Sequence, residues 1–134
     1  MFEKNIFDLI IIGAGPGGYV AAIRASQLGM KVAVVDKRAT LGGVCLNEGC
    51  IPSKALLDSS EHFAMARDKF ALHGVIVDSP RLDLGAMMLR KSDVLKKLTD
   101  GIAYLFKKTK LNSSMAPLLL RGLILLVGIR LLLR

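Results

Sequence analysis

Two cysteines with four residues between them are the residues of this chain best suited to chemistry. Cys45 and Cys50 are its only cysteines, and they lie in the segment GGVCLNEGCIPSK, residues 42–54. A backbone that folds back between them could bring their Cα atoms to about 5–6 Å, the separation that a disulfide requires. Gly49 would allow that turn where a Cβ would obstruct it, and Pro52 suits the first turn of a following helix.

Lys54 places a cation one turn beyond Cys50, so that its ammonium and the second sulfur could face the same site. A cation favours the thiolate, which is the reactive form of cysteine. Taken alone, the pair would more often be a structural disulfide or two unrelated buried thiols. A metal site would need further ligands, and His62 and His73 lie far along the chain without a clear pairing. We therefore expect no metal, and we interpret both histidines as surface or packing residues.

A second signal precedes the cysteines and favours the redox interpretation. Residues 6–12, IFDLIII, form an apolar, β-branched run that is typical of a buried parallel strand. The sequence GAGPGG follows at residues 13–18 and fits G-x-G-x-x-G. In this pattern Gly13 permits a tight turn, Gly15 lets a pyrophosphate approach the backbone, and Gly18 lets a helix lie close on the strand.

The expected helix runs from about Pro16 to Leu28, and its free N–H groups and positive dipole end suit a phosphate. A second strand over residues 31–36 ends at Asp36, 23 positions after Gly13. An acid at this distance can accept hydrogen bonds from an adenosine ribose, although alone it would be a solvated carboxylate. The pattern predicts an α/β fold in which the two strands are adjacent and parallel, joined by a right-handed crossover.

The segment GGVCLNEGCIPSK resembles the redox-active disulfide segment of the flavoprotein pyridine nucleotide-disulfide reductases. It is most similar to the dihydrolipoyl dehydrogenase group, with one departure: Val44 stands where a threonine is usual, which removes a hydroxyl that could touch the cofactor. The resemblance covers about residues 5–110. It implies that residues 1–110 are the N-terminal part of a Rossmann-like FAD-binding domain, truncated and carrying two long helices, and that residues 111–134 are an apolar tail.

The resemblance implies that two electrons pass from a dihydrolipoyl group, through the Cys45–Cys50 disulfide and FAD, to NAD⁺. Cys45 would be the interchange thiol that meets substrate, Cys50 the charge-transfer thiol facing the flavin, and Lys54 a neighbour of the flavin's reactive edge. The implied partners are a dihydrolipoyl-bearing acyltransferase or carrier protein and a second copy of the chain. The candidate cofactor-binding residues are Gly13, Gly15, Pro16, Gly17, Gly18, Asp36, Lys37, Gly42, Gly43 and Lys54.

Two alternatives stay open at this point. One is another reductase of the family, acting on glutathione or mercuric ion, against which Leu46 and the sequence Ile51-Pro52-Ser53 argue only moderately. The other is an inactive nucleotide-binding remnant, because these 134 residues hold one dinucleotide fingerprint and lack the family's NAD domain, dimerisation domain and His/Glu pair. We accordingly expect no turnover from this polypeptide by itself.

Two long helical patterns follow the cysteine segment. Two long helices are predicted over residues 53–71 and 84–109, and the resemblance identifies them as a pair inserted into the flavin domain after the redox segment.

The net charge of +8 is not arranged as lysines interleaved with aromatics, so nucleic-acid binding is not expected. No secretory signal is evident, and we expect a cytoplasmic location, or the mitochondrial matrix in a eukaryotic source.

The tail, residues 111–134, carries three arginines and no acid. Its longest charge-free run is far shorter than the roughly 20 apolar residues that span a bilayer, so a membrane helix is not expected. A reading-frame shift would explain the tail: the codons of Ser114 to Gly122, read two nucleotides later, permit His-Gly-Thr-Ala-Ala-Phe-Thr-Gly. That alternative sequence suits the glycine and phenylalanine expected after a strand in the resembled family.

Overall fold

The computed structural model describes residues 7–115. Two compact units divide the described chain, and each is taken by itself. The first unit contains residues 7–43 and 102–115, and the second contains residues 44–101. The helix α4, Leu84–Lys108, contributes residues to both units. The predictions for residues 116–134, including most of the frameshift segment and the apolar tail, lie outside the described residues.

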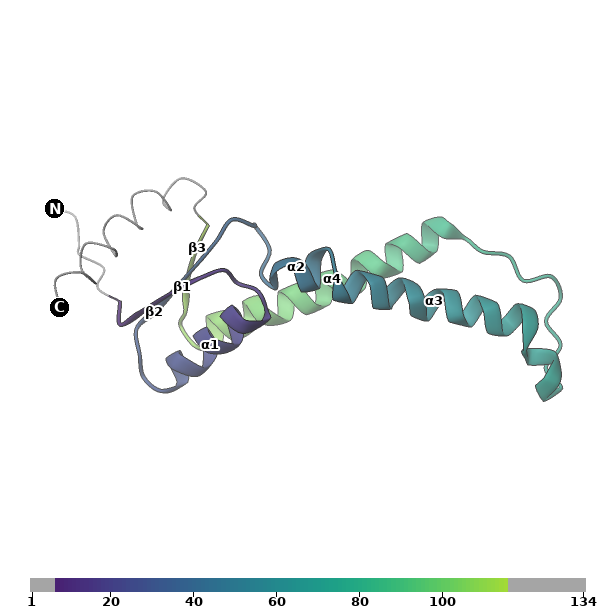
Figure 1. Cartoon of the computed structure of the whole chain (residues 1–134), viewed down its shortest axis with the longest axis horizontal. Coiled ribbons are helices and arrows are strands. Elements are labelled where there is room, and N and C mark those ends of the chain that lie inside the picture. The colour runs from purple at the N-terminus through teal and green to yellow at the C-terminus, as the bar shows by residue number, and fades with distance from the viewer. Residues whose placement is uncertain (1–6, 116–134) are drawn as a thin grey trace. The chain divides into compact units, whose positions relative to one another are not determined.

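A three-stranded parallel sheet forms the centre of the first unit. Its strands are β1 (Leu9–Ile12), β2 (Val32–Asp36) and β3 (Asn112–Met115), which are labelled in Figure 1. Their order in the sheet is β1-β2-β3. β2 pairs in parallel with both neighbours, so that Ile11 lies beside Val34 on one side and Ser113 beside Val34 on the other. The prediction of adjacent parallel strands at the ends of a βαβ unit is confirmed.

The helix α1 (Pro16–Gln27) connects β1 to β2 and packs on both strands. It begins with proline at its first position, where the missing N–H breaks no helical hydrogen bond. It ends where Gly29 adopts a φ of +86°, one residue beyond the C-terminal cap Leu28. The buried apolar side chains of this unit are Ala14, Ala22, Ala25, Val32, Val34, Val35, Ile102, Phe106 and Leu111.

The first strand is shorter than the predicted run over residues 6–12. The chain bends at Asp8, whose side-chain Oδ2 accepts a hydrogen bond from the backbone N–H of Lys31 at 2.7 Å. This side chain therefore links the chain just before β1 to the chain just before β2. β3 falls in the interval that the sequence pattern assigned to the tail, and its composition, Asn-Ser-Ser-Met, lacks the apolar pattern of a buried strand.

Helices make up the second unit. They are α2 (Gly43–Asn47), α3 (Cys50–Asp68), the 3₁₀ turn η1 (Phe70–His73) and the larger part of α4 (Leu84–Lys108). α3 begins before the predicted residue 53, because Pro52 is tolerated within the first turn. α4 agrees closely with the predicted helix over residues 84–109. α2 was not predicted, since five residues are too few to show a helical period.

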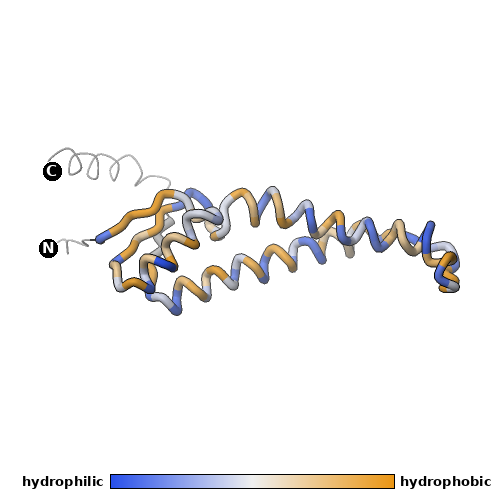
Figure 2. The backbone as a smooth tube through the Cα atoms, turned by 60° about the horizontal axis from the view of Figure 1, so that its bottom comes forward, coloured by the Kyte–Doolittle hydropathy of each residue, from blue (hydrophilic) through white to orange (hydrophobic). Residues whose placement is uncertain are grey.

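Hydropathy distinguishes the two kinds of element in Figure 2, where β1 and β2 are almost continuously hydrophobic and the long helices alternate along their length. The alternation in α4 follows its amphipathic sequence.

The side chain of Asp83 caps the N-terminus of α4, because its Oδ1 accepts a hydrogen bond from the backbone N–H of Ala86 at 2.9 Å. Within residues 7–115, none of the helices has both the length and the apolar character needed to cross a membrane.

One arginine links the two long helices of the second unit. Arg90, on α4, donates from Nη1 to the backbone oxygen of Ala55 at 3.0 Å and to the Ser59 hydroxyl at 3.1 Å. Its Nη2 donates to Asp58 Oδ2 at 2.6 Å, and both of these charged side chains are about half exposed. Three acceptors on neighbouring turns of α3 thus converge on a single guanidinium.

We predict that Arg90→Met destabilises the chain by about 1 kcal/mol, since it removes these hydrogen bonds, partly screened by solvent, while keeping the apolar stem. The matched control is Lys97→Met, which removes an exposed cation from the same helix. Urea unfolding followed by circular dichroism measures both free energies of unfolding. Equal values for the two variants would show that the Arg90 contacts do not stabilise the helix pair.

Candidate functional site

The loop between β1 and α1 is shaped by main-chain contacts that only glycine permits. Gly13 turns with a φ of +97°, and its N–H donates to the backbone oxygen of Val35 at 2.7 Å. A Cβ built on Gly18 would come within 1.8 Å of the Gly13 carbonyl oxygen. The first turn of α1 therefore lies directly against the end of β1, which is the packing that the sequence pattern assigns to the third glycine.

The segment Gly42–Gly43 folds onto this loop. The Gly42 N–H donates to the backbone oxygen of Ala14 at 2.8 Å. Gly43 has a φ of +60°, and a Cβ on it would lie 2.6 Å from the Cα of Gly15. The two glycine segments, far apart in sequence, thus touch backbone to backbone, and no larger residue fits at position 43 without displacing the loop.

Asp36 joins the end of β2 to the same loop. Its Oδ2 accepts the backbone N–H of Ala14 at 2.6 Å, and its Oδ1 accepts the backbone N–H of Arg38 at 2.8 Å. The sequence pattern predicted a ribose acceptor here and missed the contact with the loop. Because an ionised carboxylate offers about four lone-pair sites, each oxygen keeps capacity for a ligand hydroxyl. Lys37 follows on the exposed side of the chain.

The N-terminus of α1 provides a suitable place for a phosphate. Gly15 is the N-cap residue and makes no side-chain cap, and the first turn contains no acidic residue. A Cβ on Gly17 would meet nothing within 4 Å, so the approach to the backbone there is open. Uncapped N–H groups and the positive dipole end attract anions, and the absence of side chains leaves room for one. These residues fit a dinucleotide pyrophosphate.

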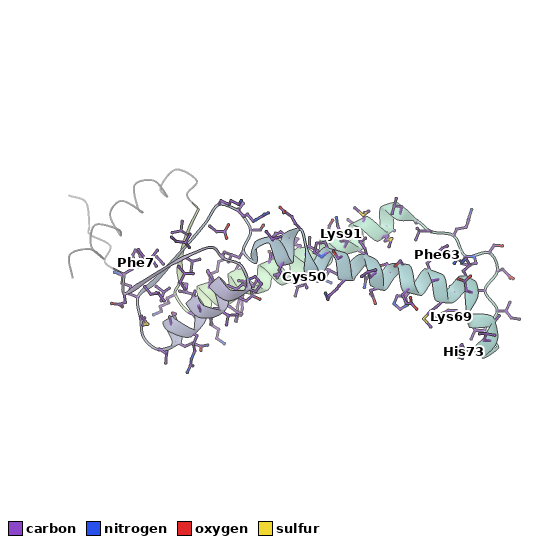
Figure 3. All side chains as sticks on the ribbon, viewed as in Figure 1. Phe7, Cys50, Phe63, Lys69, His73 and Lys91 are labelled. Carbon is purple, nitrogen blue, oxygen red and sulfur yellow. The ribbon has the colours of Figure 1, made fainter. Side chains whose placement is uncertain are left out.

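The two thiols come together in the second unit. Cys45 lies on α2. Cys50, labelled in Figure 3, is the first residue of α3. Cys50 has the largest influence on the pKa of Cys45, so the two side chains lie close enough to interact. The two sulfurs are not joined in a disulfide in this structure. The interacting pair lies at the N-terminal end of the helix that contains Lys54.

Gly49 does not act as predicted. It precedes α3 and its N–H donates to the backbone oxygen of Val44 at 2.8 Å, which closes the turn between the helices. A Cβ at this position would meet that oxygen at 3.4 Å, an ordinary van der Waals contact, and its φ of −111° is not left-handed. The prediction that a Cβ would obstruct the turn is wrong, because the nearest atoms would lie 3.4–3.8 Å from that Cβ.

Opposing effects act on the Cys45 thiol. The interaction with the Cys50 side chain raises the pKa of Cys45, and partial burial and the electrostatic interaction with Cys50 raise it further. The backbone N–H of Cys50 and the ammonium of Lys54 lower this pKa, Lys54 having the smallest effect. The net pKa of Cys45 is raised, so the effect of Lys54 on this sulfur is outweighed. The predicted influence of Lys54 on the second sulfur, Cys50, stays a prediction.

Neither histidine reaches the thiols. His62 lies twelve residues after Cys50 on α3, about 18 Å along the helix axis at 1.5 Å per residue. His73 lies at the opposite end of α3 from Cys50 (Figure 3). His62 is exposed, with its Nε2 3.7 Å from Asp58 Oδ1. Within the described part of the chain, no three His, Cys, Asp or Glu side chains are grouped so as to hold a metal ion.

The predicted site residues thus fall into two groups, one in each unit. The first group gathers the glycine loop, Asp36 and the Gly42–Gly43 segment, and the second gathers the two cysteines and Lys54. The contacts that sequence reasoning missed involve the backbone of Ala14, Val35 and Arg38. Main-chain atoms are common to all residues, so no side-chain signal marked them.

A glycine-rich loop on a parallel βαβ unit, followed in sequence by a contacting thiol pair, defines the disulfide reductases that use dinucleotides. The family model described as pyridine nucleotide-disulphide oxidoreductase matches residues 7–120. The chain belongs to this family.

Curated relatives agree with this assignment. Dihydrolipoyl dehydrogenase 1, mitochondrial, of Arabidopsis thaliana is 58% identical over 105 residues, which cover 78% of this chain and 21% of the relative. The mitochondrial dihydrolipoyl dehydrogenase of Dictyostelium discoideum is 57% identical over 111 residues, covering 83% of the chain and 23% of the relative. Leghemoglobin reductase of Vigna unguiculata is 56% identical over 105 residues, 78% of the chain and 20% of the relative. The chain spans about a fifth of the length of these relatives.

We predict that Gly18→Ala destabilises the chain by at least about 2–3 kcal/mol, since the new Cβ would collide with the Gly13 carbonyl. The matched control is Gly17→Ala, in the same helical turn, where a Cβ meets open space. That control should be neutral or gain up to about 1 kcal/mol from alanine's better helix propensity. Thermal unfolding of both variants distinguishes them, and a stable Gly18→Ala variant would contradict the packing described here.

Proposed function

We propose that this chain supplies the FAD-binding and disulfide-bearing part of a dihydrolipoyl dehydrogenase, an enzyme that oxidises a dihydrolipoyl group with NAD⁺. The observation that carries the proposal is the interacting pair of Cys45, on α2, and Cys50, the first residue of α3. This pair follows directly in sequence from the Gly42–Gly43 segment that is packed on the glycine loop. The high identity to relatives named dihydrolipoyl dehydrogenase supports the same enzyme.

The residues that would hold FAD are those of the first group. The glycine loop and the uncapped N-terminus of α1 suit the pyrophosphate, and Asp36 suits the adenosine ribose. When bound, FAD would accept the electron pair from the dithiol. Gly42 and Gly43 would support the loop in a shape that admits the pyrophosphate, because they contact its backbone at Ala14 and Gly15 without side chains. We further propose that Lys37 and Lys54 lie near the cofactor.

The thiols would exchange electrons with the substrate through disulfide chemistry. A substrate thiolate attacks the Cys45 sulfur of the oxidised pair, the Cys45–Cys50 bond breaks, and Cys50 leaves as a thiolate. The second substrate thiol then displaces Cys45 and closes the lipoyl disulfide, so that substrate loses two electrons and two protons and the pair gains the electrons. The closeness of the two side chains keeps Cys50 beside Cys45 while Cys45 is in the mixed disulfide.

The partners follow from the same assignment. We propose a dihydrolipoyl-bearing acyltransferase or carrier protein as the electron donor, NAD⁺ as the final acceptor, and a homodimer as the assembled state. The relatives from A. thaliana and D. discoideum are named as mitochondrial enzymes. We propose the mitochondrial matrix for this chain if its source is eukaryotic, and otherwise the cytoplasm.

We predict that the reduced chain in an excess of FAD develops a long-wavelength flavin–thiolate absorption band. Cys50→Ser should abolish the band because it removes the sulfur assigned to face the flavin, whereas Cys45→Ser should retain it. Absorption spectra of the three proteins, recorded anaerobically at equal FAD concentration, measure this. FAD should be bound weakly and partly lost on purification, and flavin fluorescence quenching reports the binding separately. Identical spectra for the two variants would overturn the assignment of roles.

We also predict that the purified 134-residue polypeptide produces no NADH from dihydrolipoamide and NAD⁺. Its sequence contains one dinucleotide fingerprint, which the proposal assigns to FAD rather than to NAD⁺. Both histidines lie away from the thiols, so the exchange lacks an imidazole base. The assay follows absorbance at 340 nm, with an intact dihydrolipoyl dehydrogenase as the positive control. Turnover comparable to that control would show that a second fingerprint and a neighbouring base are dispensable.

A further inference from the structure

The longest run of exposed residues in the described part of the chain begins in η1 and continues toward α4. Residues 71–79 are all exposed, and among them Ile76 is 86% exposed although its side chain is apolar. Pro80 is partly exposed, and Arg81 and Leu82 are exposed again. Folding therefore hides little of this segment, and its side chains are open to another molecule.

The main chain of residues 76–82 is equally open. In the described part of the chain, none of its N–H or carbonyl groups takes part in a main-chain hydrogen bond. The connection after β2 differs, because the Arg38 N–H donates to Asp36 Oδ1 at 2.8 Å and the Gly42 N–H donates to the Ala14 oxygen at 2.8 Å. An enzyme that needs an extended substrate must break such bonds there, whereas residues 76–82 need no opening.

Ser79 adds a local strain that an extended form relieves. Its φ of +45° lies in the left-handed region, which a residue with a Cβ rarely adopts. It also precedes Pro80, and a residue before proline favours the extended region. Binding in an extended conformation therefore moves Ser79 toward its own preference.

We propose that residues 75–82 are a substrate segment for an endopeptidase, which cuts the folded chain there and leaves its two pieces associated. An endopeptidase binds its substrate as an extended chain through main-chain hydrogen bonds, and an exposed segment with unpaired backbone suits it. Hydrolysis adds one water molecule across the peptide bond, so one new end is a carboxylate and the other an amine. Cleavage needs neither flavin nor the thiols, so this site is independent of the proposed function.

Contacts across the cut hold the two pieces together. A break after Arg81 separates the βαβ unit and both cysteines from α4 and β3. Arg90 of the second piece still donates to Asp58 of the first at 2.6 Å. In the other unit, the Ser26 hydroxyl donates to the Thr109 oxygen at 2.6 Å, and β3 pairs with β2.

The test treats the folded 134-residue chain with a small amount of trypsin and follows intact masses over time. Within residues 7–115 the first cut should fall after Arg81, at least about tenfold faster than a cut after Arg38. Synthetic peptides of residues 32–43 and 76–87 give the intrinsic rates at the two bonds. An earlier cut elsewhere in this range, or equal protection of both bonds relative to their peptides, would overturn the proposal.

The variant Arg81→Gln distinguishes the segment from its trypsin site. It keeps the exposed main chain, so thermolysin, which cuts before bulky apolar residues, should still make its first cut within residues 7–115 between Val75 and Leu82. Resistance of this segment to thermolysin in the variant would contradict the proposal.

Size-exclusion chromatography after inhibition of trypsin tests the association. The pieces should elute together in native buffer and separate in concentrated urea. The urea midpoint of the cut chain should rise with protein concentration, as for any complex of two chains, whereas that of the uncut chain should not. Separate elution in native buffer would show that the contacts across the cut do not hold the pieces.

Discussion

The structure of the nucleotide loop depends on how closely one stretch of backbone approaches another. Gly18 lies against the Gly13 carbonyl, and Gly43 lies against the Cα of Gly15, at separations that leave no room for a Cβ. Each contact fixes the start of α1 relative to the end of β1 or to the segment before the cysteines. The positions of the uncapped N–H groups, and hence any affinity for phosphate, follow from these contacts.

In the thiol pair, opposing electrostatic effects act on the pKa of one thiol, that of Cys45. Cys45 receives a backbone N–H and the field of Lys54, both of which favour its thiolate, yet its contact with the Cys50 side chain favours the thiol. The balance leaves the pKa of Cys45 raised, so the field of Lys54 does not by itself decide which form of this sulfur is favoured.

The sequence was sufficient to predict the βαβ unit, because β1, α1 and β2 carry strong apolar periods and glycine punctuation. It also placed Cys50 near the start of the helix that contains Lys54. The residue pattern did not indicate β3, which is mostly polar and joins the sheet through backbone pairing, although the resembled family expects a strand near this point. It also did not indicate α2, which has too few residues to show a period. The role of Gly49 was misjudged because the path of the chain, rather than the residue type, determines where a Cβ would point.

The contact between Asp36 and the loop has a consequence for ligand affinity. In most binding sites, part of the interaction energy is consumed in ordering side chains when the ligand arrives. Here both carboxylate oxygens already hold backbone donors, so the side chain was ordered and its charge compensated during folding. A ribose would meet a rigid acceptor whose remaining lone pairs are directed before binding, and would lose little conformational entropy on the protein side. The free-energy cost of ordering the Asp36 side chain is therefore met when the chain folds and not when a ligand binds.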